Sequence, residues 1–233
     1  MIRDPETFEA LLDSVRRFVR ERLVPAENEV AETDEIPEAI VQEMREMGLF
    51  GLTIPESYGG LELTMEEEAR LLFELCKTSP AFRSVIGTTV GIGSQGILMD
   101  GTEEQKAYYL PKLATGELSS SFALTEPDAG SDAASLRTTA IKDGDHYIVN
   151  GSKRYITNAP QAGVFTLMAR TNPADKGAGG VSAFIVDAGT PGFEIAERID
   201  VIAPHPLARL RFTNCRIPAT QRVGAAGEGF KVA

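Results

Sequence analysis

The sequence predicts an α+β protein of several domains, in which an all-α helical domain precedes an antiparallel β-sheet or β-barrel domain. Up to Gly116, apolar residues recur at the helical spacing of three and four positions. After Gly116, short runs rich in β-branched and aromatic residues are separated by Gly, Pro, Asn or Asp. No crossover helix lies between these runs, which favours antiparallel pairing. We expect a helical domain at residues 1–117, a β-domain at 118–226 and the start of a further helical domain at 227–233.

The first two helices are predicted from their end signals. Asp4 is a candidate N-cap with Pro5 at the first helical position, and the helical spacing of apolar residues continues until Pro25. A second helix is expected to begin near Pro37 and to end at Gly48, because Gly is favoured just after a helix.

A loop and two further helices follow in the first half. Residues 53–60, "TIPESYGG", are expected to form a loop because of their Pro and their paired Gly. Thr64 with Glu67, and Thr102 with Gln105, match the capping box, in which the two side chains accept hydrogen bonds from each other's backbone N–H groups. We expect a helix to begin after each capping box.

The second half contains eight runs that predict β-strands. Asp143 and Gly144 separate two of them and form a strong hairpin signal. The expected strands are residues 119–126, 136–143, 146–151, 153–158, 164–170, 181–187, 193–199 and 207–212.

The segment "GIGSQG", residues 91–96, formally matches the G-x-G-x-x-G pattern of dinucleotide-binding proteins. That fingerprint has to follow a strand and begin a crossover helix. Here the flanking residues are predicted to be helical, so the glycines are better explained by close packing between helices.

Charge is distributed unevenly along the chain. Residues 1–118 contain 11 Lys and Arg against 23 Asp and Glu, whereas residues 119–233 contain 12 against 11. Nonspecific binding to nucleic acid or to an anionic membrane needs a basic face, so this balance argues against both. A nearly neutral second half is compatible with a phosphorylated ligand.

The cysteines, the histidines and the hydropathy of the chain limit which kinds of site and which classes of protein are possible. Cys76 and Cys215 are far apart in the sequence and are expected to be buried, inert thiols. His146 and His205 are the two histidines, which gives little support to a zinc site or a His-based catalytic triad. No apolar run approaches the roughly 20 residues that cross a bilayer, and the first ten residues show no secretion or transit pattern, so we expect a cytoplasmic protein without membrane insertion.

The segment "FALTEPDAGSD", residues 122–132, has the chemistry of a ligand-binding turn. A turn after an apolar run exposes backbone N–H groups, Gly130 permits close approach, and Thr125 and Ser131 supply hydroxyls. These groups suit a ligand rich in carbonyl and phosphate oxygens, although an ordinary connection between strands is the alternative. Glu126 and Asp128 lie beside a Pro in this turn, and we expect them to anchor the loop rather than to act as an acid and base pair.

A second segment, "KRYITNA" at residues 153–159, complements the first. Tyr155 and Thr157 are two positions apart, so both project from the same face of a regular strand. An aromatic ring and a hydroxyl can form a wall for a planar heterocycle, and an amphipathic strand end is the alternative.

Six segments in this sequence resemble those of the acyl-CoA dehydrogenases. They are "GLFGLTIPESYGG", "GTEEQKAYYLPKL", "FALTEPDAGSD", "NGSKRYITNA", "NCRIP" and "GEGFKVA". The resemblance extends along essentially the whole chain and covers the helical N-terminal domain and the middle β-domain of that family. The family's C-terminal helical bundle has no counterpart among these residues.

The resemblance implies an FAD enzyme that oxidises an acyl-CoA thioester to the 2-enoyl-CoA and passes electrons to an electron-transfer flavoprotein, usually as a homotetramer. Hydrogen-bond donors near flavin N5 and the N1/C2 carbonyl edge would stabilise the charge of a reduced flavin. Ser131 is also implied on the acyl-CoA side. The implied flavin-binding residues are Phe122, Ala123, Leu124, Thr125, Gly130, Ser131, Tyr155, Ile156 and Thr157.

The family's catalytic base is a glutamate of the C-terminal domain, and no residue here matches it. We therefore expect this chain alone to bind FAD poorly and not to dehydrogenate. Two alternatives remain open: a flavin monooxygenase or oxidase of the same fold, and a non-catalytic subunit whose partner supplies the missing helices and base.

Two departures from the family pattern bear on substrate and reaction. Asp128 stands where many members have Gly. The tract Ile199–Phe212 replaces a segment that usually reads Met-Gly-x-Arg-Gly-Ser, and it places His205 between two prolines. We expect His205 in a rigid surface or interface turn, with a position facing the active site as the alternative.

Overall fold

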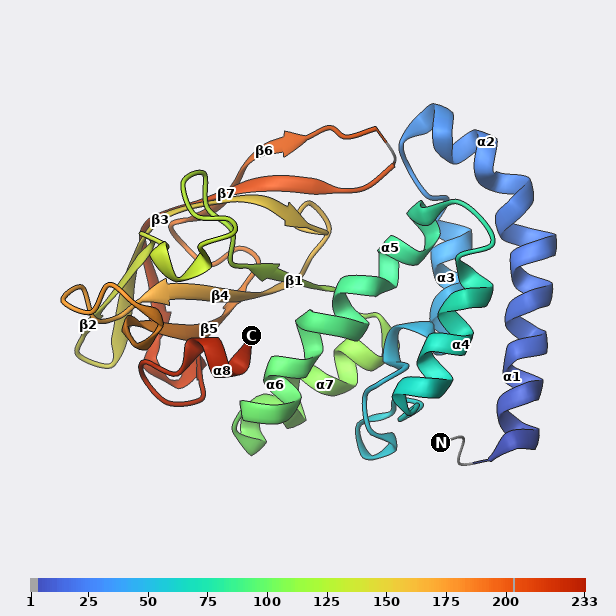
Figure 1. Ribbon diagram of the computed structural model, residues 1–233, viewed down its shortest axis with the longest axis horizontal. Coiled ribbons are helices and arrows are strands. Elements are labelled where there is room, and N and C mark those ends of the chain that lie inside the picture. Colours follow the sequence, from blue (N-terminus) through green and yellow to red (C-terminus); the bar gives the residue numbers. More distant parts are fainter. Residues whose placement is uncertain (1–3, 203) are drawn as a thin grey trace.

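The computed structural model describes residues 4–202 and 204–233 and shows helices at one end of the molecule and a sheet at the other (Figure 1). Residues 1–3, where the expected first domain begins, and residue 203, within the tract 199–212, lie outside the described residues. The predicted fold class is confirmed. The helices of the first half are α1 (Pro5–Phe18), α2 (Val24–Thr33), α3 (Glu38–Glu46), α4 (Met65–Leu75), α5 (Pro80–Thr88), α6 (Ser94–Asp100) and α7 (Glu103–Thr115).

The first helix begins as predicted but does not end at Pro25. The Asp4 carboxylate accepts hydrogen bonds from the backbone N–H groups of Glu6 and Thr7, both at 3.2 Å. A π-helical turn, Val19–Leu23, joins α1 directly to α2, and Pro25 lies in the first turn of α2. Proline has no N–H to donate, and the wider π turn before it lets the helix continue without that hydrogen bond.

The next elements agree closely with their end signals. Helix α3 ends at Glu46, and Gly48 follows in a left-handed conformation with φ of 72°. The loop at residues 53–60 contains one 3-10 turn, Glu56–Tyr58. Both capping boxes are formed, with Thr64 before α4 and Thr102 before α7. The helical half packs around one core cluster that includes Leu12, Val15, Leu23, Met44, Leu49, Leu71, Leu75, Phe82 and Ile86.

The second half forms an eight-stranded sheet in the order β6-β7-β3-β2-β4-β5-β8, with β1 beside β4. The pairings of β4 with β1 and with β2 are parallel, and the other pairings among the described strands are antiparallel. A final helix, α8 (Gly229–Val232), follows. The strands are β1 (Ser120–Ala123), β2 (Thr139–Asp143), β3 (His146–Thr157), β4 (Val164–Arg170), β5 (Val181–Asp187), β6 (Phe193–Ile199), β7 (Leu207–Pro218) and β8 (Arg222–Val223).

The strand prediction is right at the hairpin between β2 and β3 but wrong at β3 itself, and it missed the short strand β8. Residues 146–151 and 153–158 were expected to be two strands, but they form the single strand β3, which pairs with β7 along its length. Gly151 interrupts the sequence pattern without ending the strand, because irregular pairing on either side of it absorbs the change in register. Gly144 lies in the predicted turn between β2 and β3, with φ of 61°.

The G-x-G-x-x-G segment lies within helices, as predicted. Residues 89–93 connect α5 to α6, and the helix is kinked at Gly91, whose φ of −85° and ψ of −109° are not helical. A Cβ atom on Gly93 would lie 1.7 Å from the Ser120 hydroxyl oxygen, and one on Gly96 would lie 2.9 Å from a methyl carbon of Val232. The predicted close packing between helices is therefore confirmed for Gly96, which lies against α8, whereas Gly93 packs against the strand β1 and a Cβ atom on Gly91 would meet nothing within 4 Å.

The prediction for the two cysteines is half correct. Cys215 is buried in the core of the sheet, whereas Cys76 is exposed. Cys76 occupies the C-cap of α4, where the chain leaves the packed face of that helix. Within the described ranges 4–202 and 204–233, no helix has the length and apolar character needed to cross a membrane.

Candidate functional site

The two segments implied to bind a flavin lie side by side. The backbone N–H of Arg154 donates to the Thr125 carbonyl at 2.9 Å. The Ser121 hydroxyl, on β1, donates to the Thr157 carbonyl on β3 at 2.6 Å. These two contacts bring the loop at residues 122–132 against the end of β3, so Thr125 and Thr157 belong to one region of the molecule.

The nine implied residues differ in what they can offer to a ligand. Ala123 and Ile156 are buried in the core of the sheet, so only their backbone groups can reach a ligand. Phe122 and Leu124 are half-buried and pack against the cluster between the sheet and the helices. Thr125 and Thr157 are also half-buried, and Gly130, Ser131 and Tyr155 are exposed.

Tyr155 has an unusual backbone conformation. Its φ is 57°, in the left-handed region that bulky residues rarely adopt. The pairing of β3 with β7 shifts register between Lys153 and Ile156, so the regular alternation that we assumed for Tyr155 and Thr157 is interrupted. The Tyr155 side chain is 55% exposed, and the Arg154 guanidinium carbon lies 5.0 Å from the centre of its ring. Strained conformations of this kind concentrate at functional sites.

Glu126 anchors the loop, as predicted. Its carboxylate is buried and accepts hydrogen bonds from the backbone N–H groups of Arg137 at 2.6 Å and Thr138 at 2.9 Å. Lys153 donates a third hydrogen bond at 2.8 Å. Asp128 is exposed and lies 3.3 Å from the Arg137 guanidinium. The Glu126 carboxylate is therefore fully engaged in holding the loop.

Lys153 was not singled out from the sequence, although it is completely buried. Its ammonium donates to the Leu124 carbonyl at 2.9 Å as well as to Glu126. Burial lowers the pKa of Lys153 to about 8, an effect that Glu126 opposes. Burial alone would raise the pKa of Glu126, but the Lys153 charge and the hydrogen bonds outweigh it and hold that pKa below its usual value. A sequence signal could have revealed this burial. Lys153 lies an even number of positions from Tyr147 and Val149, which are buried, so the three side chains share one face of β3.

The exposed part of the loop leaves room for a ligand. A Cβ atom on Gly130 would meet nothing within 4 Å. Within the part of the chain that the structure describes, the backbone N–H groups of Gly130 and Ser131 have no hydrogen-bond partner. The Nε atom of Arg154, beside Tyr155, is buried and also has no partner among the described residues. Unpaired donors and open space around a glycine fit a ligand rich in acceptor oxygens.

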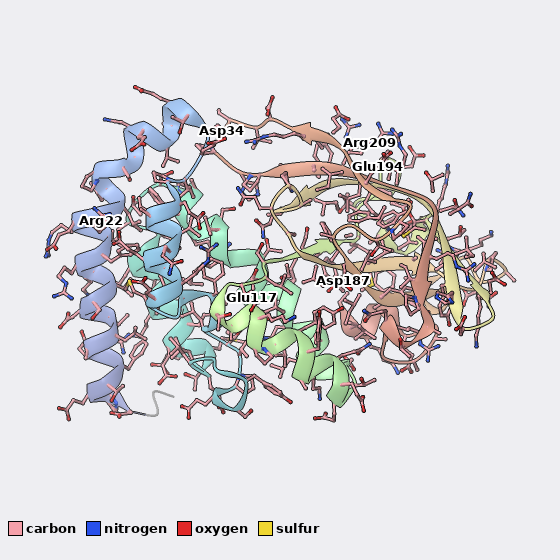
Figure 2. The ribbon with its side chains drawn as sticks, turned by 180° about the vertical axis from the view of Figure 1, so that it is seen from behind. Arg22, Asp34, Glu117, Asp187, Glu194 and Arg209 are labelled. Carbon is pink, nitrogen blue, oxygen red and sulfur yellow. The ribbon has the colours of Figure 1, made fainter. Side chains whose placement is uncertain are left out.

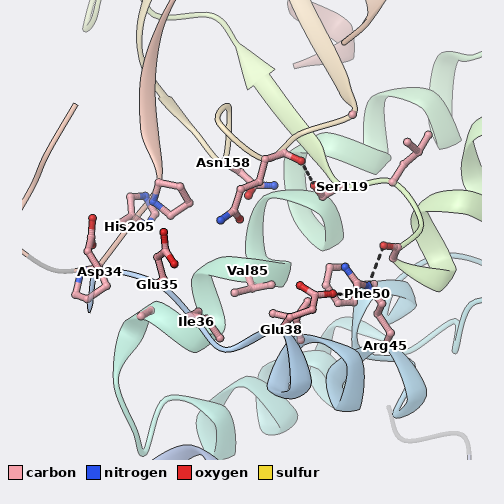
Figure 3. A pocket seen from close by; sticks show the side chains of 18 of the residues that line it. Asp34, Glu35, Ile36, Glu38, Arg45, Phe50, Val85, Ser119, Asn158 and His205 are labelled. Carbon is pink, nitrogen blue, oxygen red and sulfur yellow. Dashed lines mark hydrogen bonds and ion pairs between the residues drawn. The ribbon is translucent and has the colours of Figure 1, made fainter. Parts of the chain in front are cut away.

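A separate cavity of about 400 Å³ lies between the helical half and the sheet (Figure 3). Val85 and Phe50 come from the helical side, and Asn158 and His205 come from the sheet side. The His205 ring forms a hydrogen bond with the Ser84 hydroxyl of α5, so His205 lies at the interface between the two halves. Burial, together with the nearby Arg83 charge, lowers the pKa of His205. None of the nine implied flavin residues is among the described residues that line this cavity.

Comparisons with known proteins bear on both halves of the chain. The family model for the acyl-CoA dehydrogenase N-terminal domain matches residues 5–117, and the model for the acyl-CoA dehydrogenase middle domain matches residues 121–215. An acyl-CoA dehydrogenase of Bacillus subtilis (strain 168) is 39% identical over 221 residues, which cover 94% of this chain and 58% of that protein.

Two solved structures are also similar to this chain over nearly its whole length. An acyl-CoA dehydrogenase from Geobacillus kaustophilus matches with a TM-score of 0.91 and 34% identity over 100% of this chain and 62% of that one. The prolyl acyl carrier protein oxidase AnaB matches with a TM-score of 0.89 and 32% identity over 98% of this chain and 61% of that one. The chain thus spans about three fifths of the length of these proteins.

Proposed function

This chain belongs to the acyl-CoA dehydrogenase family, and on that premise we propose that it supplies the N-terminal and middle domains of an FAD-dependent enzyme that oxidises an acyl-CoA thioester to the 2-enoyl-CoA. The observation that carries the proposal is the contact between the two implied flavin segments, in which Arg154 donates to the Thr125 carbonyl at 2.9 Å. Members of this family are FAD-dependent oxidoreductases.

We also propose the domain organisation expected from the sequence, with boundaries at residues 117/118 and 226/227. The two family-model matches, at 5–117 and 121–215, support a division near residue 118. The change from helices to strands between α7, which ends at Thr115, and β1, which begins at Ser120, supports the same division.

The residues around the loop fit an isoalloxazine ring and its polar edge. We propose that the backbone of Phe122–Thr125 and the hydroxyls of Thr125 and Thr157 orient the flavin, with the backbone of Ile156 beside them. The exposed ring of Tyr155 would shield one side of the flavin from water, and Gly130 would let the backbone approach it. Ser131 would lie toward the acyl-CoA. A bound flavin supplies an acceptor for the hydride that leaves the β-carbon of the substrate.

We place the base that removes the α-proton in a segment that this chain does not contain. The Glu126 carboxylate is buried and fully hydrogen-bonded, and the Asp128 carboxylate is exposed and beside Arg137. The partners of Glu126 hold its pKa below the usual value, and Asp128 is open to water, so neither carboxylate has the dry, unpaired setting expected of a base. An electron-transfer flavoprotein as electron acceptor and a homo-oligomeric assembly complete the proposal.

The test uses the full-length natural polypeptide that contains these residues. We expect it to bind FAD, and we expect acyl-CoA to bleach the bound flavin without oxygen. Replacing Thr157 by Ala removes one hydroxyl from the flavin edge and should raise the dissociation constant for FAD about tenfold, the equivalent of about 1.4 kcal/mol. Thr213→Ala, on the exposed face of β7, is the matched control. A polypeptide that is colourless and indifferent to added FAD would refute the proposal.

Oxidase chemistry is a second candidate, and one observation favours it. The prolyl acyl carrier protein oxidase AnaB is 32% identical to this chain. Rapid reoxidation of the reduced flavin by oxygen would indicate an oxidase, whereas slow reoxidation with fast transfer to an electron-transfer flavoprotein would indicate a dehydrogenase. Copurification of a second polypeptide with no flavin on this one would indicate a non-catalytic subunit.

A further inference from the structure

A buried ion pair lies directly beneath the loop at residues 122–132. The Lys153 ammonium and the Glu126 carboxylate are 2.8 Å apart, and their side chains are 0% and 6% exposed. Neither side chain is among the described residues that line the cavity of about 400 Å³. The pair therefore interacts with the protein groups around it and not with the contents of that cavity.

The pair connects three segments of the chain. Lys153 belongs to β3 and donates to the Leu124 carbonyl at 2.9 Å. Glu126 accepts from the backbone of Arg137 and Thr138, which precede β2. The loop is thus tied to β3 and to the two residues that directly precede β2.

A second buried cation holds the far side of the same loop. Arg170, on β4, is 5% exposed and donates to the carbonyl groups of Leu136 at 3.2 Å and Ala134 at 2.6 Å. Residues 124–126 and 134–138 are therefore held in place by the buried side chains of Lys153, Glu126 and Arg170. Between these two anchored stretches, Gly130, Ser131 and Asp132 form an exposed tip.

Stability alone is a weak explanation for the ion pair. Removing two charges from water costs nearly as much as their attraction returns, and apolar residues of similar volume are often equally stabilising. What an apolar pair lacks is direction, because it cannot fix the orientation of a peptide group. Lys153 does fix one, at the Leu124 carbonyl.

That orientation determines where the next N–H points. The peptide bond between Leu124 and Thr125 is planar and trans, so its carbonyl and its N–H point in opposite directions. Because the carbonyl points to the buried Lys153, the Thr125 N–H points away from the ion pair. The Thr125 carbonyl is occupied by Arg154, which leaves the Thr125 N–H as the donor that this residue's backbone offers to a ligand.

We propose that Lys153 and Glu126 are positioning residues that hold the loop at residues 122–132 in the conformation that binds flavin, with Lys153 aiming the Thr125 N–H through the Leu124 carbonyl. This inference rests on the proposed function for its ligand, but the effect on the loop does not depend on the ligand.

The decisive variant removes both charges and keeps one of the two acceptor oxygens of the loop anchor. Lys153→Met combined with Glu126→Gln deprives the Leu124 carbonyl of its donor and leaves one amide oxygen for the Arg137 and Thr138 N–H groups, which bind different carboxylate oxygens in the wild type. Two measurements on the full-length protein apply: hydrogen exchange of peptides covering residues 122–132, and FAD affinity with the visible spectrum of the bound flavin. We expect at least tenfold faster exchange in the loop, at least tenfold weaker FAD binding and a shifted flavin spectrum, with the exchange of the β4–β5 core unchanged.

A single variant and a control separate the contributions of the pair. Glu126→Gln alone keeps the Lys153 donor to Leu124 but removes its counter-charge and one acceptor of the loop anchor, so we expect loop exchange and FAD affinity between those of the wild type and the double variant. Lys142→Met removes an exposed lysine from β2 and should change neither measurement. If the double variant does not fold, Lys153→Gln gives the same comparison, because its amide ends one bond short of the Leu124 carbonyl.

The outcomes separate this inference from the proposed function. A folded double variant, or Lys153→Gln in its place, with wild-type exchange in the loop would overturn the positioning role, whether or not FAD binds. Wild-type FAD affinity and spectrum in a variant whose loop exchanges faster would also overturn it. A wild-type protein that binds no FAD, but whose variants show the faster exchange, would refute the flavin function and leave the loop anchor supported.

Discussion

Glu126 shows at the scale of one residue how burial changes the chemistry of a carboxylate. Its charged form is held by Lys153 and by two backbone N–H groups. Because these partners favour the charged form, the pKa of Glu126 in the folded protein lies below its value of 4.5 in the unfolded chain. The stabilisation is thus fully present above pH 4.5 and is lost as the pH falls through the lower folded value.

The first prediction follows from the lowered pKa of Glu126. At neutral pH, Glu126→Gln should lower the free energy of unfolding by about 3 kcal/mol, because it leaves the Lys153 ammonium buried without a counter-charge. As the pH falls from 4.5 through the lower pKa of the folded protein, the wild-type carboxylate becomes protonated and the difference between the two proteins should shrink. Denaturant unfolding at several pH values measures this difference, and a pH-independent difference would contradict the interpretation.

Gly93 provides a second prediction at the residue scale. A methyl group there would lie 1.7 Å from the Ser120 hydroxyl and 2.7 Å from the Thr88 carbonyl, so β1 and the helix would have to separate. We expect Gly93→Ala to lower the free energy of unfolding by about 2 kcal/mol. Gly96→Ala is the matched control, because the atom nearest to its added methyl group is the end of the Val232 side chain, at 2.9 Å, and the nearest backbone atom is 3.4 Å away. Equal losses for the two variants would count against the packing explanation.

At the scale of elements, local signals in the sequence decide where helices begin. Thr64 accepts from the Glu67 backbone N–H, and the Glu67 carboxylate accepts from the Thr64 backbone N–H at 2.8 Å. We expect Thr64→Ala to lower the free energy of unfolding by about 1 kcal/mol, since the first turn of α4 loses its cap. Thr64→Ser keeps the hydroxyl and should lose less than half as much in the same thermal or denaturant unfolding measurement.

Elements also depart from local signals where long-range partners act on them. Pro25 was expected to end a helix, but the chain continues through a π turn into α2, which packs on the helical core through Val30. Gly151 was expected to separate two strands, but β7 pairs with β3 on both sides of it. In both cases the energy of packing or pairing along a neighbour exceeds the preference of a single residue.

At the scale of the whole molecule, a shared core and a few polar contacts join the helices to the sheet. Residues of α6 and α7 pack with β4, β5 and β8 in one buried cluster. The Arg198 guanidinium of β6 forms an ion pair with Asp34, at the end of α2 where the β6–β7 hairpin reaches the helices (Figure 2). Both side chains of this pair are nearly half exposed, at 45% and 47%, so the buried cluster is the stronger connection.

A substitution at Tyr109 tests the connection that the shared buried cluster makes between the helices and the sheet. Its ring is buried in the shared cluster, and its hydroxyl donates to Asp187 of β5 at 2.9 Å and accepts from Gln221 at 2.8 Å. We expect Tyr109→Phe to lower the free energy of unfolding by about 1–2 kcal/mol, because the Asp187 carboxylate loses a buried partner. Tyr108→Phe, on the exposed neighbour, should change it by less than about 0.5 kcal/mol. Similar losses for both variants would show that the hydroxyl does not join the two halves.

Binding of FAD should raise the free energy of unfolding of the whole molecule. If FAD binds only the folded protein, a concentration 100 times its dissociation constant adds about 2.7 kcal/mol to the free energy of unfolding. The thermal midpoint of the full-length protein should therefore rise with FAD, and it should rise less for Thr157→Ala at the same FAD concentration. A midpoint that does not respond to FAD would contradict flavin binding.

Much of the fold and the location of the candidate site followed from the sequence, for a physical reason. Helical and strand periodicity, capping boxes and turn residues act over a few positions, so they are visible without knowing the neighbours in space. The same holds for the loop at residues 122–132, whose turn chemistry and hydroxyls are local properties. The role of Glu126 as its anchor could likewise be inferred from its position beside a Pro.

Only the tertiary structure decided what lies beneath and beside that loop. The complete burial of Lys153, its hydrogen bond to Leu124 and the left-handed backbone of Tyr155 depend on partners 29 residues away or on the pairing of β3 with β7. The exposure of Cys76 and the interface position of His205 depend on how whole elements pack. Contacts between distant segments are set by the summed packing energy of the folded chain, and no local pattern of residues specifies that sum.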